Sequence, residues 1–216
     1  MNNGQIHAPI EKGKFIAFEG IDGSGKSTQI QLLNDKLKSE GIYCYTTMEP
    51  TDSPFGSLIR QILTGKIKTD SKALAALFTA DRLDHLLNDV NGIFAKISDG
   101  TTVITDRYYF SSYAYNSIDV PMDWVITTNE PSQNILRPTV TIFIDVEPDT
   151  AIDRIKQNRA HQELFEKKSM LIQVREKYLE AFEKLSDVEK VIIIDGNRPQ
   201  EVIAADIWEK TKGYFL

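Results

Sequence analysis

The chain has little cysteine, no excess of positive charge and no long apolar run. Its one cysteine, Cys44, cannot form an internal disulfide, and its place in the strand-like run Ile42–Tyr45 predicts a small buried side chain in a reducing compartment. A net charge of −6, from 25 basic and 31 acidic residues, disfavours a protein that coats nucleic acid. No apolar stretch approaches the ~18 residues that suggest a membrane span. These shortages predict a cytoplasmic protein that binds neither nucleic acid nor a membrane.

The remaining pattern is that of an α/β domain. Residues 1–13 are polar and predict a flexible leader, while residues 14–216 alternate strand-like with helix-like stretches and predict a single domain. The predicted strands are Lys14–Glu19, Ile42–Met48, Thr102–Asp106, Val140–Asp145 and Lys190–Asp195. This alternation predicts a mainly parallel five-stranded sheet with helices on both faces. Most of these strands end at an acidic residue, which places a shared ligand site at their carboxyl ends.

Two helical regions could do more than cover the sheet. The pattern over Ala73–Ile97 predicts one long helix with a wide apolar stripe, which could serve a homodimer through residues 71–98 or bury the helix within a monomer. Predicted helices over Thr150–Arg159 and Phe165–Leu185 flank a polar segment that carries an arginine. A mobile lid at about residues 153–168 would have this pattern, and a solvated helical hairpin is the alternative.

The segment Gly20–Thr28 matches the phosphate-binding pattern G-x-x-x-x-G-K-[ST], between a predicted strand and a predicted helix. Its glycines let backbone N–H groups surround an anion at the positive end of the helix. Lys26 adds a mobile charge for the β- and γ-phosphates, and the Ser27 hydroxyl can bind Mg²⁺. The predicted phosphate-binding residues are Gly20, Ile21, Asp22, Gly23, Ser24, Gly25, Lys26, Ser27 and Thr28.

The third predicted strand ends in Asp106-Arg107, which favours a kinase over other phosphate-loop proteins. A motor ATPase usually has a glutamate after this aspartate, and the guanine-reading motif N-K-x-D is absent from the sequence. We assign Asp106 to the metal and Arg107 to an anionic acceptor, with a surface ion pair as the alternative. A phosphate acceptor is already ionised at pH 7 and needs no general base. His7, His85 and His161 are therefore expected at the surface or beside the lid.

Four motifs together resemble those of bacterial and archaeal thymidylate kinases. They are Phe15–Thr28, Glu49-Pro50-Thr51, Phe78-Thr79-Ala80-Asp81-Arg82, and Asp106-Arg107-Tyr108 with Ser111, Ala114 and Tyr115. The resemblance implies a three-layer P-loop kinase fold with a small helical lid. It also implies transfer of the γ-phosphate of Mg-ATP to dTMP, giving dTDP and ADP. A kinase for another nucleotide or a deoxynucleoside, and a non-catalytic nucleotide-binding module, remain as alternatives.

The resemblance also implies roles for individual residues. Phe78 would stack on thymine, Arg82 would bind the base edge, and Tyr115 would crowd the 2′ position of the sugar. The implied catalytic residues are Lys26, Arg107, Arg159, Arg154 and Asp22. The residues implied beside adenine are Asn197 and Arg198. The other implied acceptor-site residues are Asp22, Glu49, Pro50, Phe55, Arg60, Arg107, Ser111, Ser112 and Asn116. The chain departs from the usual family pattern at Met48, Asn116 and Leu164-Phe165-Glu166, which leaves open which lid arginine acts.

Overall fold

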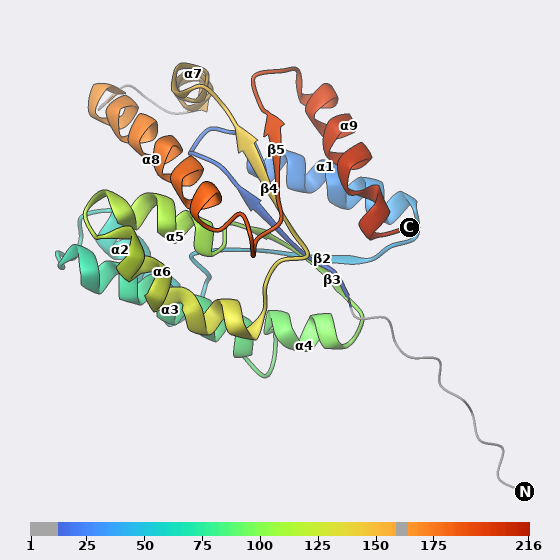
Figure 1. The fold of residues 1–216 in the computed structure, drawn as a ribbon, viewed down its shortest axis with the longest axis horizontal. Helices are drawn as coiled ribbons and strands as arrows, with labels where there is room; N and C mark the ends of the chain where they lie inside the picture. Colours follow the sequence, from blue (N-terminus) through green and yellow to red (C-terminus); the bar gives the residue numbers. More distant parts are fainter. Residues whose placement is uncertain (1–12, 159–163) are drawn as a thin grey trace, which may run out of the picture.

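The computed structural model describes residues 13–158 and 164–216, and it is built around a parallel sheet (Figure 1). The sheet contains β1 (Phe15–Glu19), β2 (Cys44–Met48), β3 (Thr102–Asp106), β4 (Val140–Asp145) and β5 (Val191–Asp195). Their order is β2-β3-β1-β4-β5, and each neighbouring pair is parallel. The α/β fold with its five-stranded sheet is thus confirmed, each strand starting within two residues of its predicted position.

Burial along the strands follows their position in the sheet. Every residue of the central strand β1 is buried, because helices cover both of its faces. In the edge strand β2, by contrast, only Cys44 is buried, and Thr46 and Met48 are exposed. Cys44, at the start of β2, is buried as predicted, and burial raises the pKa of its thiol to about 11.

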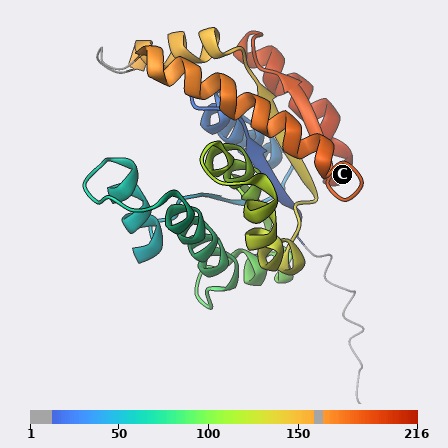
Figure 2. The ribbon, with the colours of Figure 1, turned by 60° about the vertical axis from the view of Figure 1, so that its left-hand side comes forward.

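Helices form a layer on each side of this sheet. On one side lie α1 (Lys26–Ser39) and α9 (Gln200–Thr211), and on the other lie α5 (Tyr109–Tyr115) and α8 (Leu164–Lys184), as Figures 1 and 2 show from two directions. Aromatic rings join α5 to α8, with the Phe110 and Phe182 ring centroids 4.8 Å apart. The remaining α-helices are α2 (Pro54–Leu63), α3 (Ser71–Leu87), α4 (Ile93–Ser98), α6 (Met122–Ile135) and α7 (Pro148–Asn158). Two 3₁₀ turns, η1 (Asn116–Ile118) and η2 (Lys212–Tyr214), complete the described elements.

The prediction of one long helix over Ala73–Ile97 is wrong. The structure has α3 and α4 in its place, separated by a turn at residues 88–92. The Asn88 side chain accepts hydrogen bonds from the backbone N–H groups of Val90 and Asn91, which competes with helical hydrogen bonding. At Gly92 an added Cβ would lie 2.3 Å from the Asn88 carbonyl oxygen, so the turn requires glycine.

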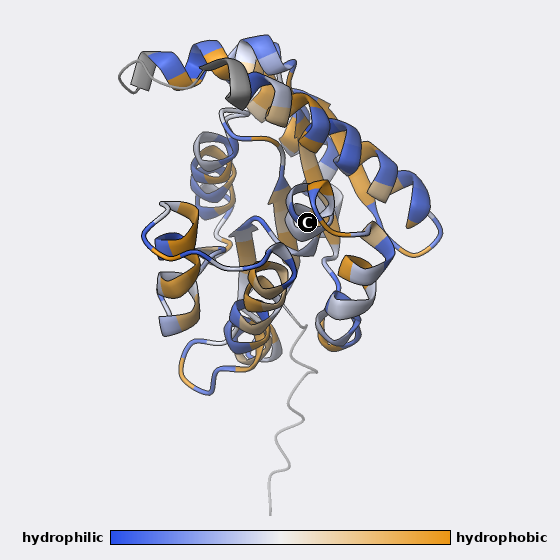
Figure 3. Ribbon diagram, turned by 90° about the vertical axis from the view of Figure 1, so that its left-hand side faces the viewer, coloured by the Kyte–Doolittle hydropathy of each residue, from blue (hydrophilic) through white to orange (hydrophobic). Residues whose placement is uncertain are grey.

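Hydrophobic residues lie mainly on the strands and on helix faces turned toward the sheet, and hydrophilic residues gather on the outer helix faces (Figure 3). Among the described residues, no helix combines the length and the apolar character needed to span a membrane. The helices α5 and α6 were not predicted from the sequence. α5 is rich in aromatic residues, and α6 contains Pro131 in its interior, so neither has a plain amphipathic pattern.

Candidate functional site

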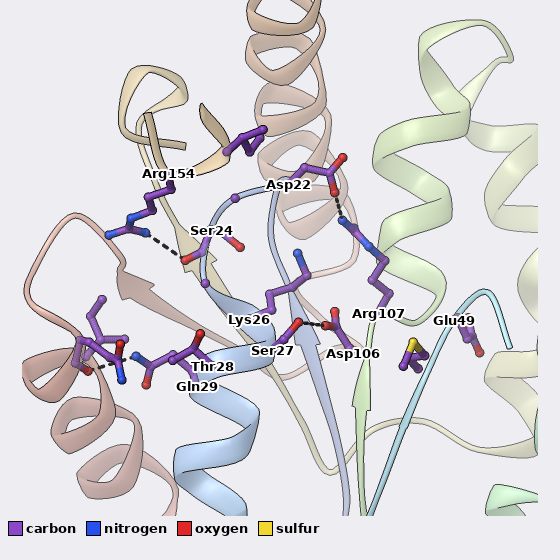
Figure 4. Close-up of a pocket in the computed structure, with 16 residues that line it drawn as sticks. Asp22, Ser24, Lys26, Ser27, Thr28, Gln29, Glu49, Asp106, Arg107 and Arg154 are labelled. Carbon is purple, nitrogen blue, oxygen red and sulfur yellow. Dashed lines mark hydrogen bonds and ion pairs between the residues drawn. The ribbon is translucent and has the colours of Figure 1, made fainter. Parts of the chain in front are cut away.

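A cleft of about 780 Å³ opens at the carboxyl ends of β1, β2 and β3 (Figure 4). Its walls come from the glycine-rich loop with the start of α1, from the ends of β2 and β3, and from α7 and α9. The lining residues are Asp22, Gly23, Ser24, Gly25, Lys26, Ser27, Thr28, Gln29, Met48, Glu49, Asp106, Arg107, Arg154, Ile155, Gln200 and Ile203. The predicted phosphate loop and the predicted Asp106–Arg107 pair therefore meet in one cleft.

Backbone conformation in the loop explains its glycines. Gly23 has φ of 80°, and a Cβ added there would lie 2.5 Å from the carbonyl oxygen of Ala151. Gly25, with φ of 95°, caps the N-terminus of α1. Glycine has no side chain, so Gly25 makes no side-chain hydrogen bond to the first N–H groups of α1. The first N–H groups of α1 are thus available to an anion in the cleft.

Lys26 lies back against its own loop and is only 7% exposed, instead of reaching out as a mobile charge. Its Nζ donates hydrogen bonds to the carbonyl oxygens of Gly20 at 3.1 Å and Ile21 at 3.2 Å. Burial lowers the pKa of Lys26 to about 8, and the positive charge of Arg107 acts in the same direction. The positive charge of Lys26 is therefore unfavourable without a nearby anion, and a bound phosphate would stabilise it.

Ser27 and Asp106 provide oxygen atoms suited to a magnesium ion. The Ser27 hydroxyl donates a hydrogen bond of 2.8 Å to Asp106 Oδ2, which joins the start of α1 to the end of β3. The other carboxylate oxygen, Asp106 Oδ1, is buried and accepts no hydrogen bond from any residue that the structure describes. Buried carboxylate oxygens are rarely left unpaired, and Mg²⁺ prefers oxygen ligands from one or two carboxylates. The donor set therefore fits this ion.

Arg107 is held in a strained backbone conformation, with φ of 74°. Its N–H donates to the carbonyl oxygen of Phe18, and its own carbonyl oxygen accepts from the Thr105 hydroxyl. Its side chain reaches across to the loop, where Nη2 lies 2.6 Å from a carboxylate oxygen of Asp22 (Figure 4). The Tyr115 hydroxyl accepts from the same Nη2 at 3.2 Å and from the backbone N–H of Asp22 at 3.1 Å. Cation and tyrosine thus lie together beside the loop.

Arg82 lies behind the cleft wall, 1% exposed. Its guanidinium binds Glu49 through Nε at 2.9 Å and through Nη2 at 2.7 Å. Its Nη1 donates to the Ser112 hydroxyl and to the side-chain carbonyl of Asn129. Glu49 itself lines the cleft, so Arg82 is connected to the cleft through Glu49. Asn129, on α6, was not foreseen because α6 was not predicted.

The expectation that His85 lies at the surface or beside the lid is wrong. His85 is buried on α3, with Nδ1 3.2 Å from Glu49 Oε1 and Nε2 2.7 Å from the Thr47 hydroxyl. Its position three residues after Arg82 puts both side chains on one helix face, where both bind Glu49. That spacing indicates a shared helix face, but it does not show that Glu49 lies opposite.

The loop after β2 is fastened to α3 and α2. The Asp81 carboxylate accepts hydrogen bonds from the backbone and hydroxyl of Thr51 and from the Ser53 hydroxyl. Arg60 Nη1 donates to the carbonyl oxygens of Pro50 and Thr51 and does not line the cleft.

Several other predicted acceptor-site residues do not line the cleft. Phe78 is half-buried on α3, Phe55 is exposed on α2, and Asn116 is half-buried at the start of η1. Ser111 is buried and directs its hydroxyl to the Glu19 carboxylate at 2.6 Å.

On the donor side, Arg154 connects two loops. It donates to the carbonyl oxygen of Ser24 at 3.2 Å and to that of Gly196 at 2.8 Å. Beyond Gly196, Asn197 and Arg198 bind Asp195, and neither lines the cleft. Arg159, His7, His161, most of the leader and the centre of the predicted lid lie outside the described residues.

Comparison with known proteins gives a consistent family assignment. Residues 18–207 match the family model described as thymidylate kinase. A probable thymidylate kinase of Methanocaldococcus jannaschii is 38% identical over 185 residues, which cover 85% of this chain and 87% of that protein. A probable thymidylate kinase of Caldivirga maquilingensis is 42% identical over 168 residues, 76% of this chain and 78% of that protein. The thymidylate kinase of Leptospira borgpetersenii is 33% identical over 195 residues, with coverage of 90% and 91%.

Proposed function

The chain belongs to the thymidylate kinase family, and we propose on that basis that its cleft transfers the γ-phosphate of ATP to dTMP, giving dTDP and ADP. It is an ATP-dependent nucleoside monophosphate kinase. The observation that carries the proposal is the meeting of Lys26, Ser27, Asp106 and Arg107 in one cleft. These residues supply what a transfer between two anions requires, namely a phosphate cradle, a metal site and a second cation.

The donor phosphates would lie on the glycine-rich loop. The N–H groups at the start of α1 would bind their oxygens, and Lys26 would exchange its two carbonyl partners for the β- and γ-phosphates. Ser27 and Asp106 would hold Mg²⁺, which when bound neutralises negative charge on the phosphate oxygens. Arg154, fixed between Ser24 and Gly196, is the described candidate for a catalytic arginine on this side.

The acceptor phosphate would bind Arg107, whose Nη2 lies beside Asp22 at the cleft. Its attacking oxygen is ionised at pH 7, so the residues have only to position it and offset its charge. We assign the thymine edge to Arg82 and Ser112, with Phe78 stacking on the ring. The support is that Arg82 is fixed by Glu49, a cleft residue, and shares a hydrogen bond with Ser112.

We further propose a homodimer formed through α3 and α4. Leu87 is 54% exposed, Val90 is 90% exposed and Phe94 is 47% exposed, so this part of the chain presents three large apolar side chains to solvent. The proposed location is the cytoplasm, where ATP is available to a nucleotide kinase.

An acceptor panel tests the function directly. Purified protein is incubated with Mg-ATP and each common nucleoside monophosphate or deoxynucleoside, and ADP release is measured. We expect the highest kcat/KM with dTMP. Activity on another acceptor but not on dTMP would favour the alternative kinase assignment. ATP binding without transfer to any acceptor would favour a non-catalytic binding module.

A further inference from the structure

We propose that Tyr178, on α8, is a positioning residue that fixes the Arg107 guanidinium for the acceptor phosphate, together with Glu19 and Ser111. The inference rests on the proposed function, because it deepens the role of Arg107 within it. None of these three residues lines the cleft among the residues described, so each would act through Arg107 and not on the substrate.

Tyr178 lies where three polar groups converge. Its hydroxyl oxygen is 2.8 Å from Glu19 Oε2, 2.8 Å from Ser111 Oγ and 3.3 Å from Arg107 Nη1. The side chain is fully buried, and its ring packs against Phe143, with centroids 5.0 Å apart. Packing therefore locks the ring, and the hydroxyl has a fixed place beside Arg107.

Glu19 sets the direction of the hydroxyl hydrogens. Its carboxylate is fully buried at the end of β1 and accepts from the hydroxyls of Ser111 and Tyr178 and from the backbone N–H groups of Tyr108 and Ser111. Each hydroxyl has one hydrogen, so donation to Glu19 leaves oxygen lone pairs for Arg107. Arg107 Nη1 donates to Ser111 Oγ at 2.9 Å and to the Tyr178 oxygen at 3.3 Å.

The same contacts offset part of the cost of burying the Glu19 carboxylate. Burial raises the pKa of the Glu19 carboxyl, while the hydrogen bond from Ser111 and the positive charge of Arg107 act in the opposite direction. An ionised Glu19 is thus compensated by the arginine that it helps to orient.

The arrangement gives the two terminal nitrogens of Arg107 different tasks. Nη1 is anchored to Ser111, to Tyr178 and to the carbonyl oxygen of Gly20. Nη2 binds Asp22 and Tyr115 beside the cleft, and we assign it to the acceptor phosphate. Loss of these Nη1 contacts would leave the positive charge in place but would let the orientation of the guanidinium vary.

Calorimetry on the full-length Tyr178→Phe variant separates a positioning role from a structural one. The affinities for dTMP and for thymidine are measured and compared. Thymidine has no phosphate, so only the binding of dTMP depends on the orientation of the Arg107 guanidinium. We expect dTMP binding to weaken about tenfold, the scale of a hydrogen bond to a charged group. Thymidine binding should stay within about twofold. The KM for dTMP should rise, and the KM for ATP should not.

Tyr113→Phe is the matched control, because Tyr113 is also a fully buried tyrosine. Its hydroxyl accepts a hydrogen bond from Gln133 and does not contact Arg107. We expect it to leave the ratio of dTMP to thymidine affinity unchanged. An unchanged ratio in Tyr178→Phe, or an equal loss for both ligands, would overturn the inference. Should Tyr178→Phe fail to fold, Ser111→Ala tests the same ratio, with the same outcomes for and against.

Failure of the proposed function would be distinguishable, since the unmodified protein would then neither bind nor phosphorylate dTMP. A protein that phosphorylates dTMP while Tyr178→Phe keeps the normal affinity ratio would refute the positioning role alone.

Discussion

Replacement of Lys26 by methionine should lower turnover strongly and at the same time stabilise the fold. Lys26 is 7% exposed and its pKa is lowered from 10.5 to about 8, first by burial and then by Arg107. A lowered lysine pKa means that the unfolded chain binds the proton more tightly than the folded one. The charged side chain therefore destabilises the folded protein at every pH below about 8.

The size of this effect follows from the shift. A fall of roughly 2.5 pKa units at 1.36 kcal/mol each corresponds to about 3 kcal/mol at pH 7. The cost decreases as pH rises from 8 toward 10.5, because the folded protein then loses its proton first. At pH 9.5 about half of it should remain. Methionine fills a similar volume without charge, so it should recover most of this free energy.

Urea unfolding of the Lys26→Met variant and the unmodified protein at pH 7 and pH 9.5 measures both the gain and its pH dependence. Lys38→Met is the matched control, because Lys38 is exposed on the same helix and its replacement should change stability by less than about 0.5 kcal/mol. Turnover of Lys26→Met should fall by at least 100-fold. A Lys26→Met protein less stable than the unmodified one at pH 7 would refute the reasoning about the buried ammonium group.

The remaining predictions concern four other sites. Arg82→Ala should lower the free energy of unfolding by about 3–5 kcal/mol, since it leaves Glu49 buried without its cation, and a chemical denaturation curve unchanged in midpoint would contradict this. Asp106→Asn should raise the Mg²⁺ concentration needed for half-maximal activity, and a magnesium titration with the same midpoint would argue against a metal role. Phe94→Glu should convert a dimer to a monomer in light scattering, and an unchanged mass would remove α4 from the interface. Cys44, with its pKa raised to about 11, should react with a thiol reagent at pH 8 far more slowly in the native protein than in urea, and equal rates would contradict its burial.

The sequence predicts the strands well because each has β-branched or aromatic residues at its centre and ends near a polar residue. It also predicts the loop and the Arg107 strand end, since both are local motifs whose meeting follows from parallel strands ending at one edge. The long helix over 73–97 was mispredicted because its apolar spacing continues past Asn88, whose side chain ends the helix by local hydrogen bonding.

Long-range partners could not be predicted in this way. His85 is an ordinary helical position until Glu49 and Thr47 are brought beside it by β2. Tyr178 lies 71 residues along the chain from Arg107, and only the packing of α8 against α5 brings the two together. The spacing of residues along one element has no information about a partner on another element.

The Glu49 carboxylate, shared between Arg82 and His85, makes the acceptor wall of the cleft stiff. One of its oxygens binds Arg82 and the other lies beside His85, so one turn of α3 is fastened to the end of β2 and through it to the sheet. α3 and β2 are thus expected to move as one rigid body. Any closure over two bound nucleotides would have to come from the opposite wall, where α7 contributes Arg154 and Ile155. During the catalytic cycle, α7 would then move toward a wall of α3 and β2 that stays fixed.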